Sequence, residues 1–166
     1  MEGETLNFQL SRSVLLDSSV VIKWFRKDEV LRDRAIQLRQ AYLDGQLTIY
    51  VPDLLVYEIA NVLRYKPDLD RAQVQQALES LFAMQIKIKD ITGGVIRRAI
   101  EIAYSYGITV YDAAFVAMAE HLETDFITAD EKLGQMLQNI SCVRYLADLA
   151  SLEEERNPNR ETTGSN

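Results

Sequence analysis

The sequence predicts an α/β fold in which a parallel β-sheet carries helices on both faces. Short apolar runs alternate along the chain with longer stretches of helical spacing, and strands separated by helices form parallel sheets. The chain has 166 residues, 48% apolar and 26% charged, which suits one folded domain and excludes a disordered or fibrous protein. Its longest uninterrupted apolar run, residues 113–119, is far shorter than the roughly 20 residues of a membrane-spanning helix.

The strands are predicted from five runs of β-branched and other apolar residues. The second run ends at Pro52, and in the third run Ile86 and Ile88 alternate with Lys87 and Lys89. In chain order the runs cover residues 14–17, 47–51, 86–90, 125–128 and 143–146.

Amphipathic stretches between these runs predict the helices. Asp28 can cap a helix that ends before Gly45, and Asp70 can cap another whose apolar residues follow helical spacing. A helix over residues 94–106 is predicted to stop at Gly107, because glycine suits the left-handed position after a helix. The remaining helices are predicted over residues 18–25, 52–65 and 131–137, and over a stretch that begins at Asp112.

Both ends of the chain are predicted to lie outside a single domain of residues 13–150. Residues 1–12 form a tail or an edge strand, because apolar and polar residues alternate there, and residues 151–166 form a polar tail that we expect to be disordered. The first twelve residues do not resemble a signal peptide, and the single Cys142 cannot form an internal disulfide. We therefore expect a cytoplasmic protein.

Acidic residues outnumber basic ones along the chain. The formal net charge is −7, which argues against a broad basic surface that coats nucleic acid. Residues 1–12 and 153–166 together carry six acidic and three basic residues, so the core between them has a net charge of −4.

Four acids of this core lie near the ends of predicted strands, where an α/β sheet binds its ligands. Asp17 ends the first strand and Asp130 follows the fourth. Glu58 lies within a strongly apolar helix, and Asp112 opens a run of seven small or apolar residues. The topology of a parallel sheet therefore favours bringing these four acids together at one edge.

Each acid alone also has a purely structural interpretation. Asp17 and Asp130 can cap the helices that follow them. Asp112 can complement the dipole at the start of its helix. Glu58 can form an ion pair, for which the candidate partners are Arg34 and Arg64.

Taken together, the four acids indicate a metal site. Carboxylates held close together repel one another unless a cation neutralises them. Oxygen ligands favour Mg²⁺ or Mn²⁺, and the scarcity of histidine and cysteine argues against zinc. The lone His121 is predicted to be a surface or interface residue, whereas Thr128 is placed to orient a neighbouring carboxylate.

The segments around these acids closely resemble the PIN domain, and most of all its VapC-type branch, the ribonuclease toxins of type II toxin–antitoxin systems. The likeness covers residues 14–146 and rests on four motifs in the family's order: DSSVVIKWF, PDLLVYEIANVL, YDAAFVAMAE and TADEKL. The resemblance implies a PIN fold with a five-stranded parallel sheet in the order 3-2-1-4-5. It also implies that the family's catalytic and metal-binding acids correspond to Asp17, Glu58, Asp112 and Asp130, supported by Thr128 and Ser19.

The resemblance further implies a Mg²⁺- or Mn²⁺-dependent endoribonuclease in which metal-activated water hydrolyses an RNA phosphodiester bond. RNA would be the substrate, an antitoxin protein would cover the site, and the chain would form a homodimer without contacting a membrane. Trp24 and Phe25 are candidates for lining an apolar groove that receives the partner. Candidates for the dimer surface are Tyr104, Tyr106 and His121, and candidates for RNA contact are Lys23, Arg26, Lys27 and Arg64.

Three other functions remain open from the sequence. The chain could be a PIN nuclease of RNA processing or decay, a non-catalytic PIN-fold module that binds a protein, or a metal-dependent phosphatase or phospho-acceptor domain. The common phosphatase pattern requires a second aspartate two residues after the first, where this chain has Ser19. A phospho-acceptor domain requires a lysine after the last strand, where this chain has Ala147 and Asp148. The intact set of acids argues against the non-catalytic module.

Overall fold

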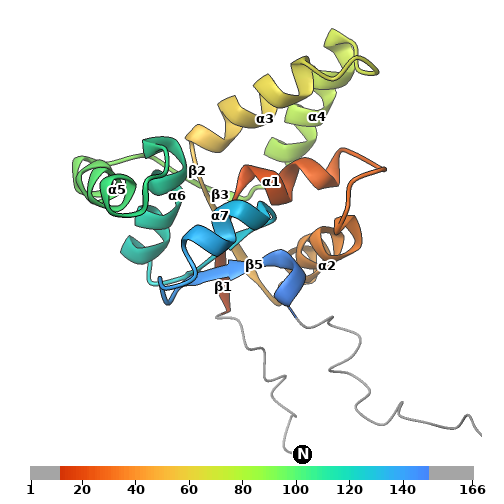
Figure 1. The fold of residues 1–166 in the computed structure, drawn as a ribbon. Coiled ribbons are helices and arrows are strands. Elements are labelled where there is room, and N and C mark those ends of the chain that lie inside the picture. The colour runs from red at the N-terminus through yellow and green to blue at the C-terminus, as the bar shows by residue number, and fades with distance from the viewer. Residues whose placement is uncertain (1–11, 150–166) are drawn as a thin grey trace, which may run out of the picture.

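A computed structural model describes residues 12–149, and its centre is a parallel β-sheet of five strands in the order β3-β2-β1-β4-β5 (Figure 1). Both the predicted fold class and the predicted strand order are confirmed. The polar tail predicted over residues 151–166 and nearly all of the tail or edge strand predicted over residues 1–12 lie outside the described residues. The strands are β1 (Ser13–Leu16), β2 (Thr48–Pro52), β3 (Lys87–Lys89), β4 (Asp125–Thr128) and β5 (Val143–Tyr145).

The central strand β1 pairs in parallel with β2 on one side and β4 on the other. Leu15 is in register with Tyr50 of β2 and with Phe126 of β4. Helices cover both faces of the sheet, so β1 is buried on both: Val14 and Leu16 on one face and Leu15 on the other are fully buried. The carboxyl ends of β1 and β4 therefore lie side by side.

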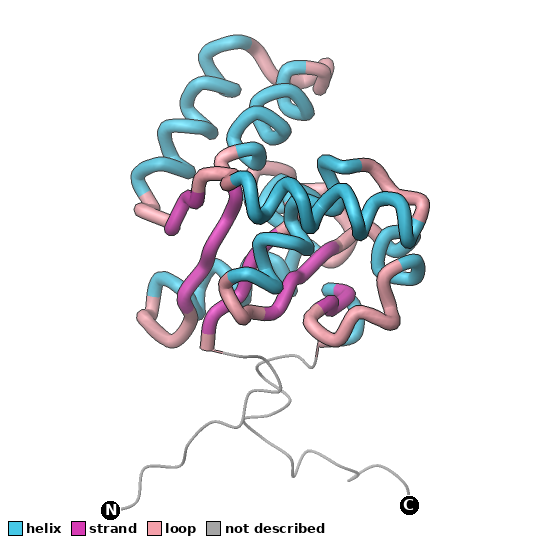
Figure 2. The backbone as a smooth tube through the Cα atoms, turned by 90° about the vertical axis from the view of Figure 1, so that its left-hand side faces the viewer, coloured by secondary structure: helices cyan, strands magenta, loops and turns pink. Residues whose placement is uncertain are grey.

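The helices surround this sheet on both faces and at its carboxyl edge. Figure 1 shows α5 and α6 on one side of the sheet and α2 on the other. In both views α3 and α4 form a helical hairpin that projects from the edge where the strands end (Figures 1 and 2). The helices are α1 (Ser18–Val21), η1 (Ile22–Trp24), α2 (Arg32–Leu43), α3 (Leu54–Arg64), α4 (Arg71–Ala83), α5 (Gly93–Tyr106), α6 (Val110–His121), α7 (Glu131–Met136) and η2 (Leu146–Asp148).

Two helix ends follow the predicted local chemistry. Asp70 caps α4 through a reciprocal capping box with Gln73, which satisfies two backbone N–H groups of the first turn. Gly107 follows α5 with a φ of 65°, a left-handed conformation that glycine adopts without steric cost.

Two helices differ from the prediction. The helix expected to be capped by Asp28 begins at Arg32, because Leu31 at its N-cap has a left-handed backbone with a φ of 61°, which interrupts a helix that starts earlier. The stretch predicted as one helix over residues 18–25 divides into the single α-helical turn α1 and the tighter 3₁₀ turn η1.

The helix α6 forms the centre of the core, as its apolar sequence predicts. Residues 113–119 are all buried, and the Phe115 ring lies 6.3 Å from that of Phe126. Within residues 12–149 no single helix is long and apolar enough to span a membrane; α5 and α6 meet that test only as a pair bent by 120°.

Trp24 belongs to this core rather than to a surface groove, which corrects the interpretation made from the sequence. Its side chain is buried, and its indole Nε1–H donates to the carbonyl oxygen of Ala35 at 2.8 Å. Phe25 is only half-buried and packs against the edge of the core.

Candidate active site

Asp17 lies where β1 ends and α1 begins. It occupies the N-cap position of α1, but its carboxylate makes no capping hydrogen bond there. The carboxylate oxygen Oδ2 instead accepts hydrogen bonds from the Ser19 hydroxyl at 2.6 Å and from the Thr128 hydroxyl at 2.8 Å. The helix-cap interpretation of Asp17 therefore fails, because Ser19 and Thr128 bind the carboxylate instead.

The two hydroxyls that bind Asp17 are themselves oriented by the backbone. The N–H of Ala129 donates to Ser19 Oγ at 2.9 Å, and the N–H of Asp130 donates to Thr128 Oγ1 at 3.1 Å. Because each hydroxyl oxygen accepts one backbone proton, its own proton is free to point at the carboxylate. Ser19 and Thr128 thus fix the Asp17 side chain from two neighbouring strand ends.

Burial raises the pKa of Asp17 above its ordinary value. The hydrogen bonds from Ser19 and Thr128 lower the pKa, and the negative charge of Asp112 raises it. A buried carboxylate beside a second negative charge is a site that favours a cation.

Glu58 approaches the same place from α3. Its side chain is half-buried; burial raises its pKa, a hydrogen bond from Ser18 lowers it, and the charges of Asp17 and Asp112 raise it. Neither arginine considered as its partner binds it. Arg34 donates to the backbone carbonyls of η2, and the Arg64 guanidinium lies 5.2 Å from the Tyr65 ring.

Asp112 projects from the first turn of α6. Thr109, the N-cap residue, donates its hydroxyl proton to Asp112 Oδ2 at 2.7 Å, and the Asp112 N–H donates to Thr109 Oγ1 at 3.0 Å. Thr109 was not predicted as a site residue, although a threonine three residues before an acid is a recognisable helix-start signal.

Asp130 differs from the other three acids. It is exposed, and its Oδ1 accepts from the N–H of Leu133 at 3.0 Å, so that it caps α7. Its backbone N–H, through Thr128, links it to Asp17. We name Asp17, Glu58 and Asp112 the carboxylate cluster, because their charges act on one another; Asp130 lies at its rim.

The donor chemistry of the cluster suits a hard divalent cation, since every side-chain donor is an oxygen. In the part of the chain that the structure describes, no three acidic, histidine or cysteine side chains converge closely enough to ligate one ion without moving.

Substitutions at Asp130 can distinguish the contribution of its helix-capping hydrogen bond from that of its negative charge. Replacing it with asparagine, which caps helices equally well, should leave the melting temperature nearly unchanged, whereas alanine should cost about 1 kcal/mol of stability. Thermal denaturation of the two variants measures this. An alanine variant as stable as the parent would show that the capping bond is unimportant.

Two of the four predicted RNA-contacting cations are engaged elsewhere. Lys23 was predicted to contact RNA. In the structure it is buried and pairs with Glu29, so it is not available to a ligand. Arg26 binds Asp68 at 2.6 Å. Lys27 and Arg64 are exposed.

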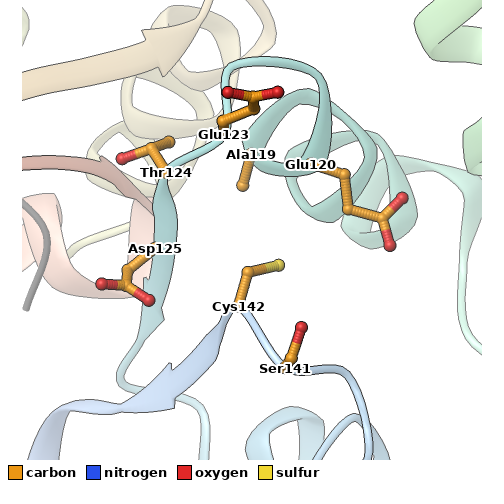
Figure 3. A pocket seen from close by; sticks show the side chains of 7 residues that line it. All are labelled: Ala119, Glu120, Glu123, Thr124, Asp125, Ser141 and Cys142. Carbon is orange, nitrogen blue, oxygen red and sulfur yellow. The ribbon is translucent and has the colours of Figure 1, made fainter.

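A separate pocket of about 370 Å³ lies at the opposite edge of the sheet, where β4 and β5 begin (Figure 3). Burial raises the pKa of the Cys142 thiol in this pocket, and the charge of Glu120 raises it further. The thiol is therefore protonated at neutral pH and is a poor nucleophile. The carboxylate cluster remains the candidate active site. The pocket is lined by Ala119, Glu120, Glu123, Thr124, Asp125, Ser141 and Cys142.

Comparison with known proteins agrees with this geometry. Residues 14–136 match the PIN domain family. The chain is 29% identical over 127 residues to Ribonuclease VapC3 of Pyrobaculum aerophilum, covering 74% of this chain and 92% of that protein.

Solved structures share the fold at lower identity. A toxin–antitoxin complex from Klebsiella pneumoniae has a TM-score of 0.60 at 18% identity, covering 80% of this chain and 97% of that one. VapBC2 from Rickettsia felis, bound to a DNA fragment from its promoter, has a TM-score of 0.60 at 14% identity, covering 80% and 98%. At such identities the similarity shows the fold alone.

Proposed function

This chain belongs to the PIN-domain family, and from that premise we propose that it is a metal-dependent endoribonuclease acting in the cytoplasm. One observation carries the proposal: the buried Asp17 carboxylate after β1 is held by Ser19 and Thr128, and its charge, together with that of Asp112 in α6, raises the pKa of Glu58 in α3. The similarity to a protein named Ribonuclease VapC3 supports RNA as the substrate.

In this proposal Asp17, Glu58 and Asp112 hold Mg²⁺ or Mn²⁺, and Asp130 contributes from the rim. When bound, such an ion lowers the pKa of a water molecule and stabilises the charge that develops on a phosphodiester. Ser19 and Thr128 keep the Asp17 carboxylate in place, so its orientation does not depend on the substrate. None of these steps requires a histidine or a cysteine.

We propose further that the chain is the toxin of a toxin–antitoxin pair. Its relative is named VapC3, and structures that share its fold are toxin–antitoxin assemblies. The carboxylate cluster offers a negative field to which a basic side chain of a partner protein would bind.

We also propose that the chain forms a homodimer through α5. Ile96, Ile100 and Tyr104 are exposed and recur every four residues, so they form an apolar stripe along one side of that helix. Of the predicted dimer residues, Tyr104 is 88% exposed and His121 is exposed, whereas Tyr106 is half-buried and packs against the core.

A direct assay tests the ribonuclease. The purified chain, incubated with a panel of RNAs, should cleave in Mg²⁺ or Mn²⁺ and leave 5′-phosphate ends, and EDTA should stop the reaction. Cleavage that persists in EDTA would overturn the metal-dependent mechanism. Absence of cleavage throughout, together with tight binding of a protein partner, would favour the non-catalytic module.

Metal binding should also be visible as stability. Only the folded chain assembles the cluster, so Mg²⁺ or Mn²⁺ at about ten times its dissociation constant should stabilise by roughly 1.4 kcal/mol and raise the melting temperature by about 2–5 °C. Asp112→Asn should remove most of this rise. Glu79→Gln, which removes an exposed acid on α4, is the matched control and should retain it. A rise of equal size in both variants would place the ion elsewhere.

A further inference from the structure

The last described turn of the chain is bound to α2 through Arg34. One nitrogen of its guanidinium, Nη1, donates to the backbone carbonyl oxygens of Leu146, Ala147 and Leu149. The Leu149 side chain also packs against the core. Residues 150–166 therefore continue the chain from a fixed point beside α2.

Two other arginines of α2 lack a partner in the part of the chain that the structure describes. Arg32 and Arg39 are half-buried, and the Nε atom of each is buried without a hydrogen-bond acceptor. Neither forms an ion pair with another residue of the range 12–149. A buried N–H group without an acceptor costs free energy, so both side chains indicate an acceptor outside the described residues.

Arg32 and Arg39 lie on one side of α2. They are seven positions apart, and Ile36 and Leu43 fall on the same side because they follow Arg32 by four and eleven positions. Ile36 packs against the edge of the core, whereas Leu43 is 54% exposed. We call these four residues the arginine face of α2.

The charge of α2 is opposite in sign to that of the whole chain. The helix contains three arginines and one aspartate, a net charge of +2, whereas the chain carries −7. Two acids that flank the helix bind elsewhere: Glu29 pairs with Lys23, and Asp44 accepts a hydrogen bond from Gln40. Neither of them supplies a counter-charge to the arginine face, which is therefore suited to carboxylates from another segment.

Three consecutive glutamates, residues 153–155, follow Leu149 within reach of this face. The four residues from Leu149 to Glu153 span up to about 14 Å when extended. A helix with its side chains is about 10–12 Å across, so the glutamates can reach the side of α2 that lies away from Arg34. Along the helix axis Arg34 lies between the two unpartnered arginines, about 3 Å from Arg32 and about 7.5 Å from Arg39.

We propose that the glutamates at positions 153–155 bind the arginine face, so that the C-terminal segment crosses α2 as a strap. Each guanidinium would hold a carboxylate through Nε and one Nη, which gives the buried Nε–H an acceptor. The proposal is independent of the ribonuclease function. It differs from the expectation that residues 151–166 form a disordered tail.

Trypsin tests the strap in the full chain. Arg156 directly follows the glutamates, and Arg160 lies four residues farther along. If the strap forms, cleavage after Arg156 should be at least about fivefold slower than in a free peptide of residues 150–166, because cleavage requires the segment to detach. Cleavage after Arg160 should be equally fast in both. Mass spectrometry of the products gives the two rates.

Variants test whether the arginine face is the binding surface. Arg32→Gln combined with Arg39→Gln should remove the protection at Arg156. In the unmodified chain, about 0.5 M NaCl should also remove it, because salt screens exposed ion pairs, and this measurement needs no substitution in the fold. Arg71→Gln combined with Arg97→Gln removes the same charge from exposed positions of α4 and α5 and should retain the protection.

Four results would overturn the proposal. Cleavage after Arg156 as fast in the chain as in the peptide would show that the segment is not held. Equal loss of protection in the Arg71 and Arg97 control would show an effect of overall charge. Protection that increases with protein concentration would show that a second copy supplies the segment. If Arg32→Gln with Arg39→Gln lowers the affinity for RNA and leaves cleavage after Arg156 unchanged, the arginine face binds nucleic acid instead.

Discussion

Asp17→Asn should abolish RNA cleavage and, in the same protein, should raise the melting temperature measured without metal. Asparagine is nearly isosteric and can still accept the hydrogen bonds of Ser19 and Thr128, so the fold is retained. The substitution removes a charge that would hold the metal ion directly. The loss of activity should therefore exceed the roughly 10–100-fold loss seen when an outer-sphere partner of a metal ligand is removed.

The gain in stability has a definite dependence on pH. The pKa of Asp17 is raised in the folded chain by burial and by Asp112, so the folded state favours the protonated acid. Below the unfolded pKa of about 3.9 both states are protonated and the acid costs nothing. As the pH rises above that value, the unfolded chain ionises first and the folded chain is increasingly destabilised, until the pH passes the raised pKa of Asp17 and the penalty becomes constant.

The difference in melting temperature between Asp17→Asn and the unmodified chain should therefore be near zero at pH 3.5. It should grow to about 2–4 °C at pH 7, which corresponds to roughly 1 kcal/mol for a domain of this size. Thermal melts in EDTA across this range measure the difference, and Asp90→Asn, an exposed acid, serves as the control. An Asp17→Asn chain that cleaves RNA at the normal rate would show that the metal-site assignment is wrong. One that melts no higher at pH 7 would show that the buried charge is not a source of strain.

Local signals in the sequence were sufficient for much of the fold. The Asp70 cap, the stop at Gly107 and the buried α6 each depend on residues within a few positions of one another, and the structure shows all three. The Asp28 cap failed because Leu31 adopts a left-handed backbone directly before the helix, a conformation that helical periodicity does not encode.

In the candidate site, the position of an acid after a strand does not determine its role, whereas the contacts of its side chain do. Asp17 and Asp130 both follow strands and both precede helices, so the sequence gives them the same two interpretations. In the structure Asp130 caps its helix and Asp17 does not, because Ser19 and Thr128 hold the Asp17 carboxylate instead. The contact between Thr128 and Asp17 spans 111 positions and depends on the pairing of β1 with β4.

The cations predicted to contact RNA were chosen because they lie near the acids in the sequence, and this too does not determine where their side chains lie. Lys23 follows Asp17 by six residues, but the tight turn η1 directs it into the protein, where it meets Glu29. Ser18 was not predicted as a site residue, yet its hydrogen bond lowers the pKa of Glu58, which lies 40 positions later in the sequence. Such contacts follow from tertiary packing and could not be derived from a single sequence.

Expression of this chain alone should slow growth, and co-expression of a small partner gene encoded beside it should relieve the effect. In the proposed toxin, the partner protects the host by occupying the carboxylate cluster with a basic side chain. A lysine or arginine there would replace the metal ion as the neutralising charge. Asp17→Asn should remove the toxicity and also weaken the complex, because it reduces the charge that attracts the partner.

The purified pair provides the decisive measurement. The complex should cleave RNA far more slowly than the free chain, and a large excess of Mg²⁺ should partly release the inhibition, since the ion and the partner's cation compete for the same carboxylates. Asp90→Asn should leave the affinity for the partner unchanged, because that exposed acid lies outside the cluster. A pair that forms no complex, or a complex that cleaves RNA as fast as the free chain, would exclude the toxin assignment. In that case the same carboxylates would belong to a PIN nuclease of RNA processing or decay, whose activity needs no inhibitor.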